Sequence, residues 1–200
     1  MRCIVILLVL VFIFGISAEP QHKVRSQIET TKLIKDIVRD FNGIESPKDL
    51  KALRFIMMYN LEVKNYTSRK RRHERKIRWR RTATEIFQDG FVYNDQGEAD
   101  LVIAYVALCK ALGVKARYVT LWSAQDLHTV AEIALGDVWF IYDVAANDAE
   151  PVEGIITKKN GFEGWKLWRK GRDAWDIGLK SFKDRKKLCE DFDCNNIAGR

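Results

Sequence analysis

The feature that most constrains the fold of this sequence is the segment from Gly97 to Leu112. Its apolar residues recur at helical spacing and almost none of its faces is polar, which predicts a helix buried on all sides. Gly113, directly after it, is typical of the end of a helix. A buried helix needs other elements around it, and 47% hydrophobic residues in a chain of 200 are enough to supply them. The sequence therefore predicts a folded domain of ordinary size and excludes wholesale disorder.

Further helices and three strands are expected around this segment. Gly136-Asp137 has the composition of a two-residue hairpin turn, and apolar runs lie on both sides of it. Ser46-Pro47 is typical of a helix start, because serine caps the helix and proline fits its first position. Strands are expected over residues 116–122, 128–135 and 138–144, and helices over residues 24–41, from 47 onward, 82–88 and 181–188. Helices followed by a hairpin predict an α+β domain.

The N-terminal segment has the composition of a targeting sequence. Met1-Arg2 is followed by an apolar run from Cys3 to Ile16, which is shorter than the roughly 20 residues that a bilayer span needs. The small residue Ala18 provides a cleavage position. We therefore predict a signal peptide or an N-terminal anchor over residues 1–18, and an exported protein that is secreted or membrane-anchored.

Three further cysteines follow this segment. In an oxidising compartment, Cys189 and Cys194 could close a small loop that contributes about 2 kcal/mol, or both could remain free thiols. Cys109 falls within the buried helix and is expected in the core. No C-x-x-C spacing indicates a metal finger, and neither a metal nor another cofactor is expected.

The positive charge of the chain is concentrated in one run. Residues 69–81 contain nine Lys or Arg and one acid, so this run carries +8 while the whole chain carries +7. A uniformly basic nucleic-acid-binding domain would differ from this, and export also argues against nucleic acid. The run from Arg69 to Arg81 is either a solvated face or a patch for an anionic surface, such as phospholipid headgroups or an acidic polymer.

Several segments together resemble the transglutaminase-like superfamily, whose core is related to papain-type cysteine proteases. The most specific of them is the helix end that reads Ala-Leu-Gly-Val-x-Ala-Arg-Tyr-Val. The segments are Thr82–Phe87, Gly97–Leu101, Ala107–Val119, His128–Ile133 and Trp139–Asp143. The resemblance implies a papain-like, transglutaminase-like core in which N-terminal helices pack on a small antiparallel β-sheet.

The resemblance also implies where an active site would lie. The family has a nucleophilic Cys at the N-terminus of the buried helix, a basic His on the next strand and an orienting Asp on the strand after it. His128 matches the base, Asp143 matches the orienting acid, and the position of the nucleophile falls on Glu98. Cys109 cannot substitute, because eleven residues of helix separate it from this position by about 16 Å.

A glutamate cannot perform the chemistry of the thiol. A carboxylate with a pKa of about 4.3 is ionised at neutral pH but is a weak nucleophile toward amides. One interpretation is a degenerate site, in which the protein binds or scaffolds an unidentified protein, peptide or polysaccharide. A second is altered chemistry by a hydrolase or acyltransferase, with Glu98, His128 and Asp143 acting as a general acid–base pair or holding a divalent cation. A third is that the correspondence is shifted or that the fold differs.

No long linker divides the chain. Residues 1–18 form the signal or anchor, residues 19–79 a helical N-terminal part with the basic run, and residues 80–150 the transglutaminase-like core. Residues 151–200 form a Trp-rich extension of the same domain. Its indoles are expected to cover the core rather than to stack on sugars, because tryptophan buries a large area.

Overall fold

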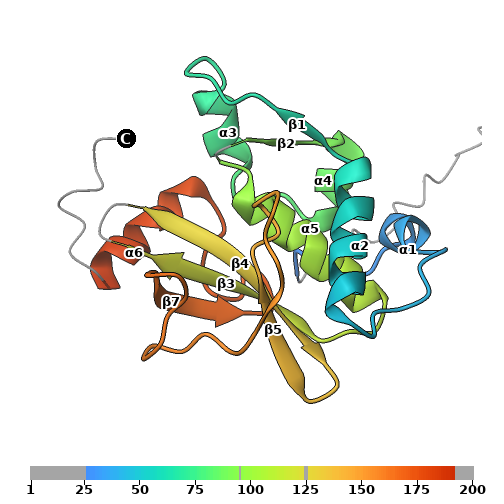
Figure 1. Ribbon diagram of the computed structural model, residues 1–200. Helices are drawn as coiled ribbons and strands as arrows, with labels where there is room; N and C mark the ends of the chain where they lie inside the picture. The colour runs from blue at the N-terminus through green and yellow to red at the C-terminus, as the bar shows by residue number, and fades with distance from the viewer. Residues whose placement is uncertain (1–25, 95, 124–125, 192–200) are drawn as a thin grey trace, which may run out of the picture.

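A computed structural model describes residues 26–94, 96–123 and 126–191. Its centre is helix α5 (Glu98–Ala111), which has α1, α2 and α4 on one side and a β-sheet on the other (Figure 1). Eleven consecutive residues of α5 are buried, which confirms the prediction of a fully enclosed helix. The other helices of the described chain are α1 (Lys32–Ile37), α2 (Pro47–Tyr59), α3 (Arg71–Ile77), α4 (Ala83–Asp89), the 3-10 helix η1 (Phe182–Arg185) and α6 (Lys186–Asp191).

The main sheet has five antiparallel strands in the order β6-β5-β4-β3-β7. Gly136 forms the turn of the β4–β5 hairpin with a φ of 60°, as the sequence predicts. The strands are β3 (Ala116–Trp122), β4 (Leu127–Leu135), β5 (Val138–Tyr142), β6 (Val152–Glu153) and β7 (Lys166–Gly171). A separate parallel pair joins β1 (Glu62–Lys64) to β2 (Phe91–Tyr93).

Both faces of the central strands are buried. One face packs on α5 through residues that include Tyr118, Ile133 and Tyr142. The opposite face forms a second cluster around Val130 and Ile156, against which Trp165 packs. The sheet therefore lies between the helices and the segment that follows β6, and this confirms the predicted α+β fold.

The N-terminal helix is shorter than its apolar periodicity predicts. Of the expected helix over residues 24–41, only α1 forms, while Ser26 and Gln27 are buried outside any helix; residues 24 and 25 lie outside the described residues. The Gln27 side chain donates hydrogen bonds to the carbonyl oxygens of Trp79 (3.2 Å) and Arg81 (2.9 Å). These long-range bonds replace the helical bonds that the local sequence would favour.

Strand β7 was not expected from the sequence. It is an edge strand, and its exposed Lys and Arg side chains obscure the alternation that would indicate a strand. The tryptophans around it cover the core, as predicted: Trp168 is buried, and Trp175 donates an indole hydrogen bond to the Trp79 carbonyl at 2.6 Å.

The basic run divides into an exposed and a buried part. Arg81 is buried, where it pairs with Asp100 (2.6 Å) and Asp89 (2.9 Å), and Arg78 pairs with the buried Glu74. The residues before Arg78 form α3 and the loop ahead of it. Most of the exposed cations therefore lie in the earlier part of the run, and Arg80 is exposed in the later part.

Three predictions concern segments beyond the described residues. The signal or anchor over residues 1–18 lies there entirely, as does Cys194, so export and the Cys189–Cys194 bond stay predictions. In the described part of the chain, no helix is both long and apolar enough to cross a membrane.

Candidate functional site

Helix α5 begins at Glu98, and residues 94–97 separate it from strand β2. The residue before Glu98 is Gly97, and a Cβ atom there would lie 2.2 Å from the carbonyl oxygen of Tyr93. Only glycine therefore allows the chain to turn this tightly from β2 into the helix. The partial positive charge at the helix N-terminus favours the carboxylate of Glu98 at this position.

The hairpin β4–β5 brings the two other predicted residues to Glu98. His128 lies near the start of β4, and Asp143 directly follows β5, which is the strand paired with β4. His128 Nδ1 lies 3.1 Å from Glu98 Oε2, and His128 Nε2 lies 2.9 Å from Asp143 Oδ2. The other Asp143 oxygen accepts hydrogen bonds from the backbone N–H groups of Ala145 and Ala146. The structure thus places all three predicted side chains in one line, with His128 in the middle.

The two carboxylates hold a proton on the imidazole. Burial lowers the pKa of His128, but the hydrogen bonds that the ring donates to Asp143 and Glu98 outweigh it and raise the pKa to about 10. Burial would raise the pKa of Asp143, but the imidazolium brings it below its usual range. Because each ring nitrogen faces a carboxylate, both donate, and the ring is an imidazolium at neutral pH. The three side chains together carry a charge of −1.

The indole of Trp165 flanks His128, with 5.3 Å between the ring centroids. Trp165 belongs to the segment after β6, which the buried Glu132 holds in place. Glu132 Oε1 accepts a hydrogen bond from the Ile156 N–H at 2.6 Å, and Lys170 Nζ lies 3.2 Å from Glu132 Oε2. The sequence signal for this role is a lone acid, Glu132, between apolar residues of a strand, and this signal does not identify its partners.

A buried ion pair stabilises the first turn of α5. Arg81 binds Asp100 in this turn and also donates to the Phe91 carbonyl at 3.2 Å. Burial lowers the pKa of Arg81, but Asp100 and Asp89 outweigh this and raise it. Nothing in the sequence connects Asp100 to Arg81, which lies 19 residues before it.

The remaining candidates do not reach the site. Cys109 is fully buried in α5, and burial raises the pKa of its thiol well above the usual range, so it is a core residue. Within the residues that the structure describes, no group of three His, Cys, Asp or Glu side chains could hold a metal ion. In the line of Glu98, His128 and Asp143, the two carboxylates lie at opposite ring nitrogens of the imidazole.

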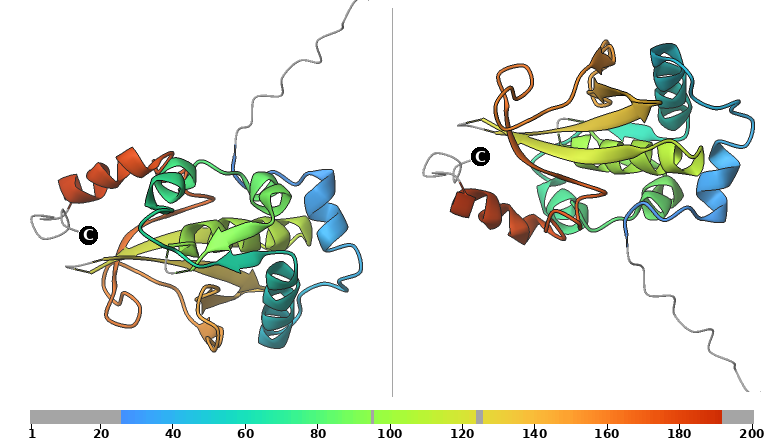
Figure 2. Two further views of the ribbon diagram at one scale, coloured as in Figure 1. Left: turned by 90° about the horizontal axis from the view of Figure 1, so that it is seen from above. Right: turned by 90° about the horizontal axis from the view of Figure 1, so that it is seen from below.

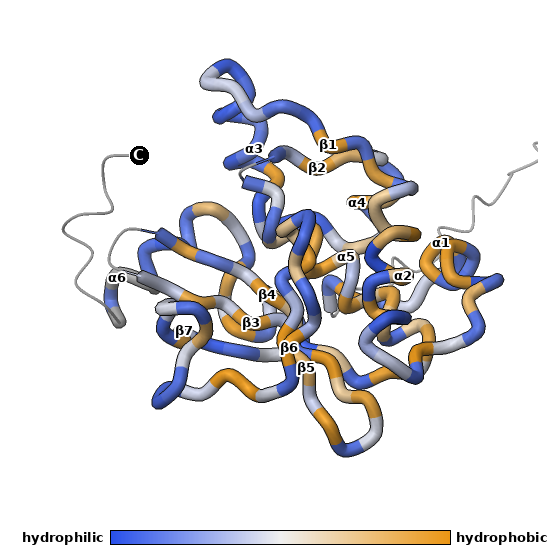
Figure 3. The backbone as a smooth tube through the Cα atoms, viewed as in Figure 1, coloured by the Kyte–Doolittle hydropathy of each residue, from blue (hydrophilic) through white to orange (hydrophobic). Residues whose placement is uncertain are grey.

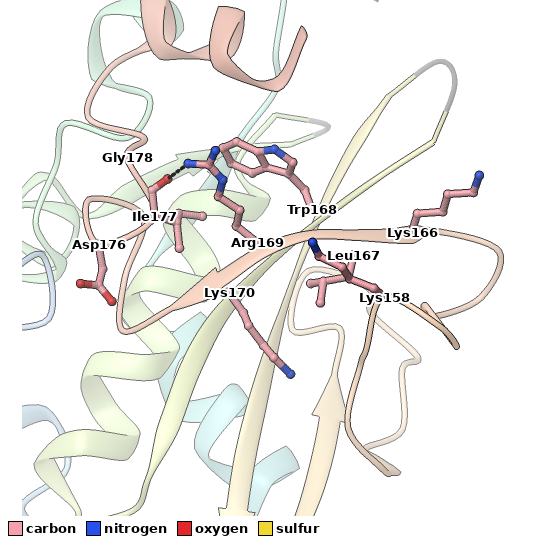
Figure 4. A pocket seen from close by; sticks show the side chains of 9 residues that line it. All are labelled: Lys158, Lys166, Leu167, Trp168, Arg169, Lys170, Asp176, Ile177 and Gly178. Carbon is pink, nitrogen blue, oxygen red and sulfur yellow. Dashed lines mark hydrogen bonds between the residues drawn. The ribbon is translucent and has the colours of Figure 1, made fainter. Parts of the chain in front are cut away.

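An open cavity of about 950 Å³ lies elsewhere, along strand β7 (Figure 4). Figure 4 shows Arg169 and Lys170 on opposite sides of the strand, with Ile177 and Gly178 beside Arg169. Arg169 donates to the Ile177 carbonyl at 3.4 Å, and Lys170 is bound to Glu132. None of the three site residues lines this cavity, so it is a separate feature.

Comparisons with known proteins identify the family. A crystal structure of a candidate cysteine protease from Cytophaga hutchinsonii is similar to this chain, with a TM-score of 0.51 and 21% sequence identity. The match covers 76% of this chain and 48% of that protein, so the chain spans about half the length of the solved structure. No curated protein matches the sequence significantly. The family model of the transglutaminase-like superfamily matches residues 36–144, which is more than half of the chain and includes all three site residues. The chain belongs to the transglutaminase-like superfamily.

Proposed function

We propose that this protein is a transglutaminase-like domain without thiol catalysis, which acts by binding or scaffolding a protein, peptide or polysaccharide. One observation carries the proposal. A carboxylate oxygen of Glu98 lies 3.1 Å from His128 Nδ1, at the helix terminus where the family resemblance expects a thiol. The line of acid, imidazole and acid retains the form of a catalytic triad but contains no nucleophile suited to acyl transfer.

The chemistry of the site argues in the same direction. If the Glu98 carboxylate attacked an amide, the resulting tetrahedral adduct would expel the carboxylate rather than the amine, because carboxylate is the better leaving group. A general base must also be unprotonated near the working pH. His128, with a pKa of about 10, donates from both nitrogens and has no lone pair available at pH 7.

A hydrolase or acyltransferase with altered chemistry would require a different protonation behaviour at this site. Its acid–base pair would need one member to change protonation near neutral pH. The two carboxylates stabilise the imidazolium of His128, so the ring keeps its proton near neutral pH and does not meet this requirement. Glu98 is the most exposed of the three side chains, at 33% against 14% for each of the others, so a ligand would meet the site through this carboxylate.

An activity assay with two variants separates these possibilities. The full-length protein, Glu98→Ala and His128→Ala are tested for hydrolysis of a generic peptide amide and for incorporation of a primary amine. We expect no turnover above background for any of the three proteins. A rate in the unmodified protein that both substitutions abolish would exclude the proposal and support altered chemistry at this site.

A further inference from the structure

Two strongly basic segments of the chain lie side by side. Helix α3 contacts η1, although more than 100 residues separate them in the sequence. In Figure 1 the η1 end of the red helix lies nearest to α3, and α6 leads away from α3 toward the C-terminus. Residues 180–187 carry five Lys or Arg and one Asp, a net charge of +4, and they adjoin the run at residues 69–81.

An aromatic ring holds the two segments together. The ring centroid of Phe182 lies 4.7 Å from the guanidinium carbon of Arg75 and 5.3 Å from that of Arg78. These cation–π contacts attach η1 to α3. They also bring Arg185 near two other guanidinium groups. Burial, together with repulsion from Arg78 and Arg75, lowers the pKa of Arg185, so positive charge is crowded at this junction.

Among the described residues, most of these cations have no acidic partner. Glu74 is occupied by Arg78, and Asp184 by Lys187 at 2.8 Å. The exposed cations on α3 form no ion pair with any described residue, and α3 is hydrophilic along its length (Figure 3). We define the composite basic surface by six side chains: Arg71, Arg72, Lys76, Lys183, Arg185 and Lys186.

The point at which the chain enters the domain indicates what this surface faces. Gln27 binds the carbonyl oxygens of Trp79 and Arg81, at the end of the basic run. Both views in Figure 2 place the start of the described chain on the same side of the molecule as α3 and α6. The apolar run that ends at Ile16 is joined to Gln27 by ten residues, which span at most about 40 Å. A bilayer that holds the apolar run is therefore within reach of the composite basic surface.

We propose that the composite basic surface binds the anionic headgroups of a phospholipid bilayer. A bilayer presents many fixed phosphates to several cations at once, which matches a surface assembled from two segments. The attraction is electrostatic, so it weakens as salt shortens the screening length. This proposal is independent of the site at Glu98 and would stand if that site proved catalytic.

The test uses the full-length chain and two kinds of vesicle. Phosphatidylcholine vesicles measure the contribution of the apolar N-terminal run. Vesicles that also contain phosphatidylglycerol measure that contribution plus the effect of anionic headgroups. We call the ratio of partition into the anionic vesicles to partition into the neutral ones the anionic excess. We expect the anionic excess to be about tenfold or more at low salt and to vanish at high salt.

Three double variants locate the surface. Arg72→Glu with Lys76→Glu alters α3, and Lys183→Glu with Lys186→Glu alters η1 and α6. Lys158→Glu with Lys159→Glu is the control, since both residues are exposed on the loop after β6 and the net charge changes equally. Thermal unfolding checks that all three remain folded. Each surface pair should reduce the anionic excess about tenfold or more, and the control should leave it within about twofold.

Three results would overturn the proposal. Equal loss in all three variants would mean that only net charge matters. A C-terminal pair that behaves like the control would remove η1 and α6 from the surface. In the third result, the unmodified protein shows no anionic excess on vesicles, while both double variants of the surface bind a single-stranded oligonucleotide more weakly than the unmodified protein does. That result would assign the surface to nucleic acid.

Discussion

At the scale of single residues, the unusual feature is an imidazole between two carboxylates. His128 keeps its proton only while Glu98 and Asp143 lie beside it, so its charge is coupled to folding. In the unfolded chain its pKa returns to about 6.5. The stabilisation from this proton is therefore complete below about pH 6.5 and is lost as the pH rises toward about 10.

This coupling predicts the pH dependence of stability. Between about pH 6.5 and 10 the native state holds one more proton than the unfolded state at this residue. The free energy of unfolding should fall by about 1.4 kcal/mol per pH unit on this account. Urea unfolding across the range, compared between the unmodified protein and His128→Gln, isolates this contribution as a difference. His73→Gln, at an exposed histidine, is the control and should leave the slope unchanged. A difference that does not vary with pH would contradict the pairing.

A second prediction at this scale concerns the thiol that Glu98→Cys would introduce. A helix N-terminus and an imidazolium both stabilise a thiolate, so its pKa should fall well below the usual 8.5 or so. Alkylation at pH 6.5, mapped by peptide mass spectrometry, should be about 100-fold faster there than at the buried Cys109.

The combined variant Glu98→Cys/His128→Gln is the control for this thiol. It keeps the helix N-terminus but removes the imidazolium, so most of the rate advantage should disappear. If position 98 reacts no faster than Cys109, the assignment of Glu98 to the nucleophile position is wrong.

At the scale of secondary-structure elements, one buried acid holds the segment that carries Trp165. Glu132 binds the Ile156 N–H together with Arg117 and Lys170. Glu132→Gln keeps an acceptor for Ile156 but removes the negative charge, and it should lower the free energy of unfolding by about 2 kcal/mol. Amide exchange should accelerate between residues 156 and 165. Glu153→Gln, at an exposed residue of β6, should change neither measurement. Unchanged exchange in Glu132→Gln would show that the segment is held by its apolar contacts alone.

The sequence predicts some secondary-structure elements correctly and misses others. The ends of α5 and the β4–β5 turn follow from local signals, namely apolar periodicity, Gly113 and Gly136, so they could be predicted. The positions of His128 and Asp143 followed from the family resemblance. Strand β7 and the truncated N-terminal helix depend on partners more than 40 residues away, which no local pattern reports. Glu132 also depends on non-local partners, which lie 15 to 38 residues away on β3, on β7 and on the loop after β6.

At the scale of the whole molecule, the start of the described chain is joined to the Trp-rich extension. Ser26 and the Gln27 N–H bind the buried carboxylate of Asp173, and the Gln27 side chain accepts a hydrogen bond from the Trp175 N–H at 3.2 Å. The same side chain donates to Trp79 and Arg81. The N-terminal part, the core and the Trp-rich extension therefore share one buried polar network, which favours a single cooperative unit.

The network predicts how Gln27→Ala unfolds. The substitution leaves the Trp175 backbone N–H and the Arg81 carbonyl oxygen without their partner, in a place that water does not reach, while the Trp79 carbonyl keeps the hydrogen bond from the Trp175 indole. Buried groups that lose their hydrogen bonds cost about 1–3 kcal/mol each, so the free energy of unfolding should fall by about 3 kcal/mol or more. Gln88→Ala, at an exposed residue of α4, should change it by less than about 0.5 kcal/mol.

Because all three parts share the network, the midpoints of urea unfolding measured by tryptophan fluorescence and by far-ultraviolet circular dichroism should shift together in Gln27→Ala. If the fluorescence midpoint moved while the dichroism midpoint stayed in place, the Trp-rich extension would be a separate folding unit, and the polar network would join two domains rather than close one.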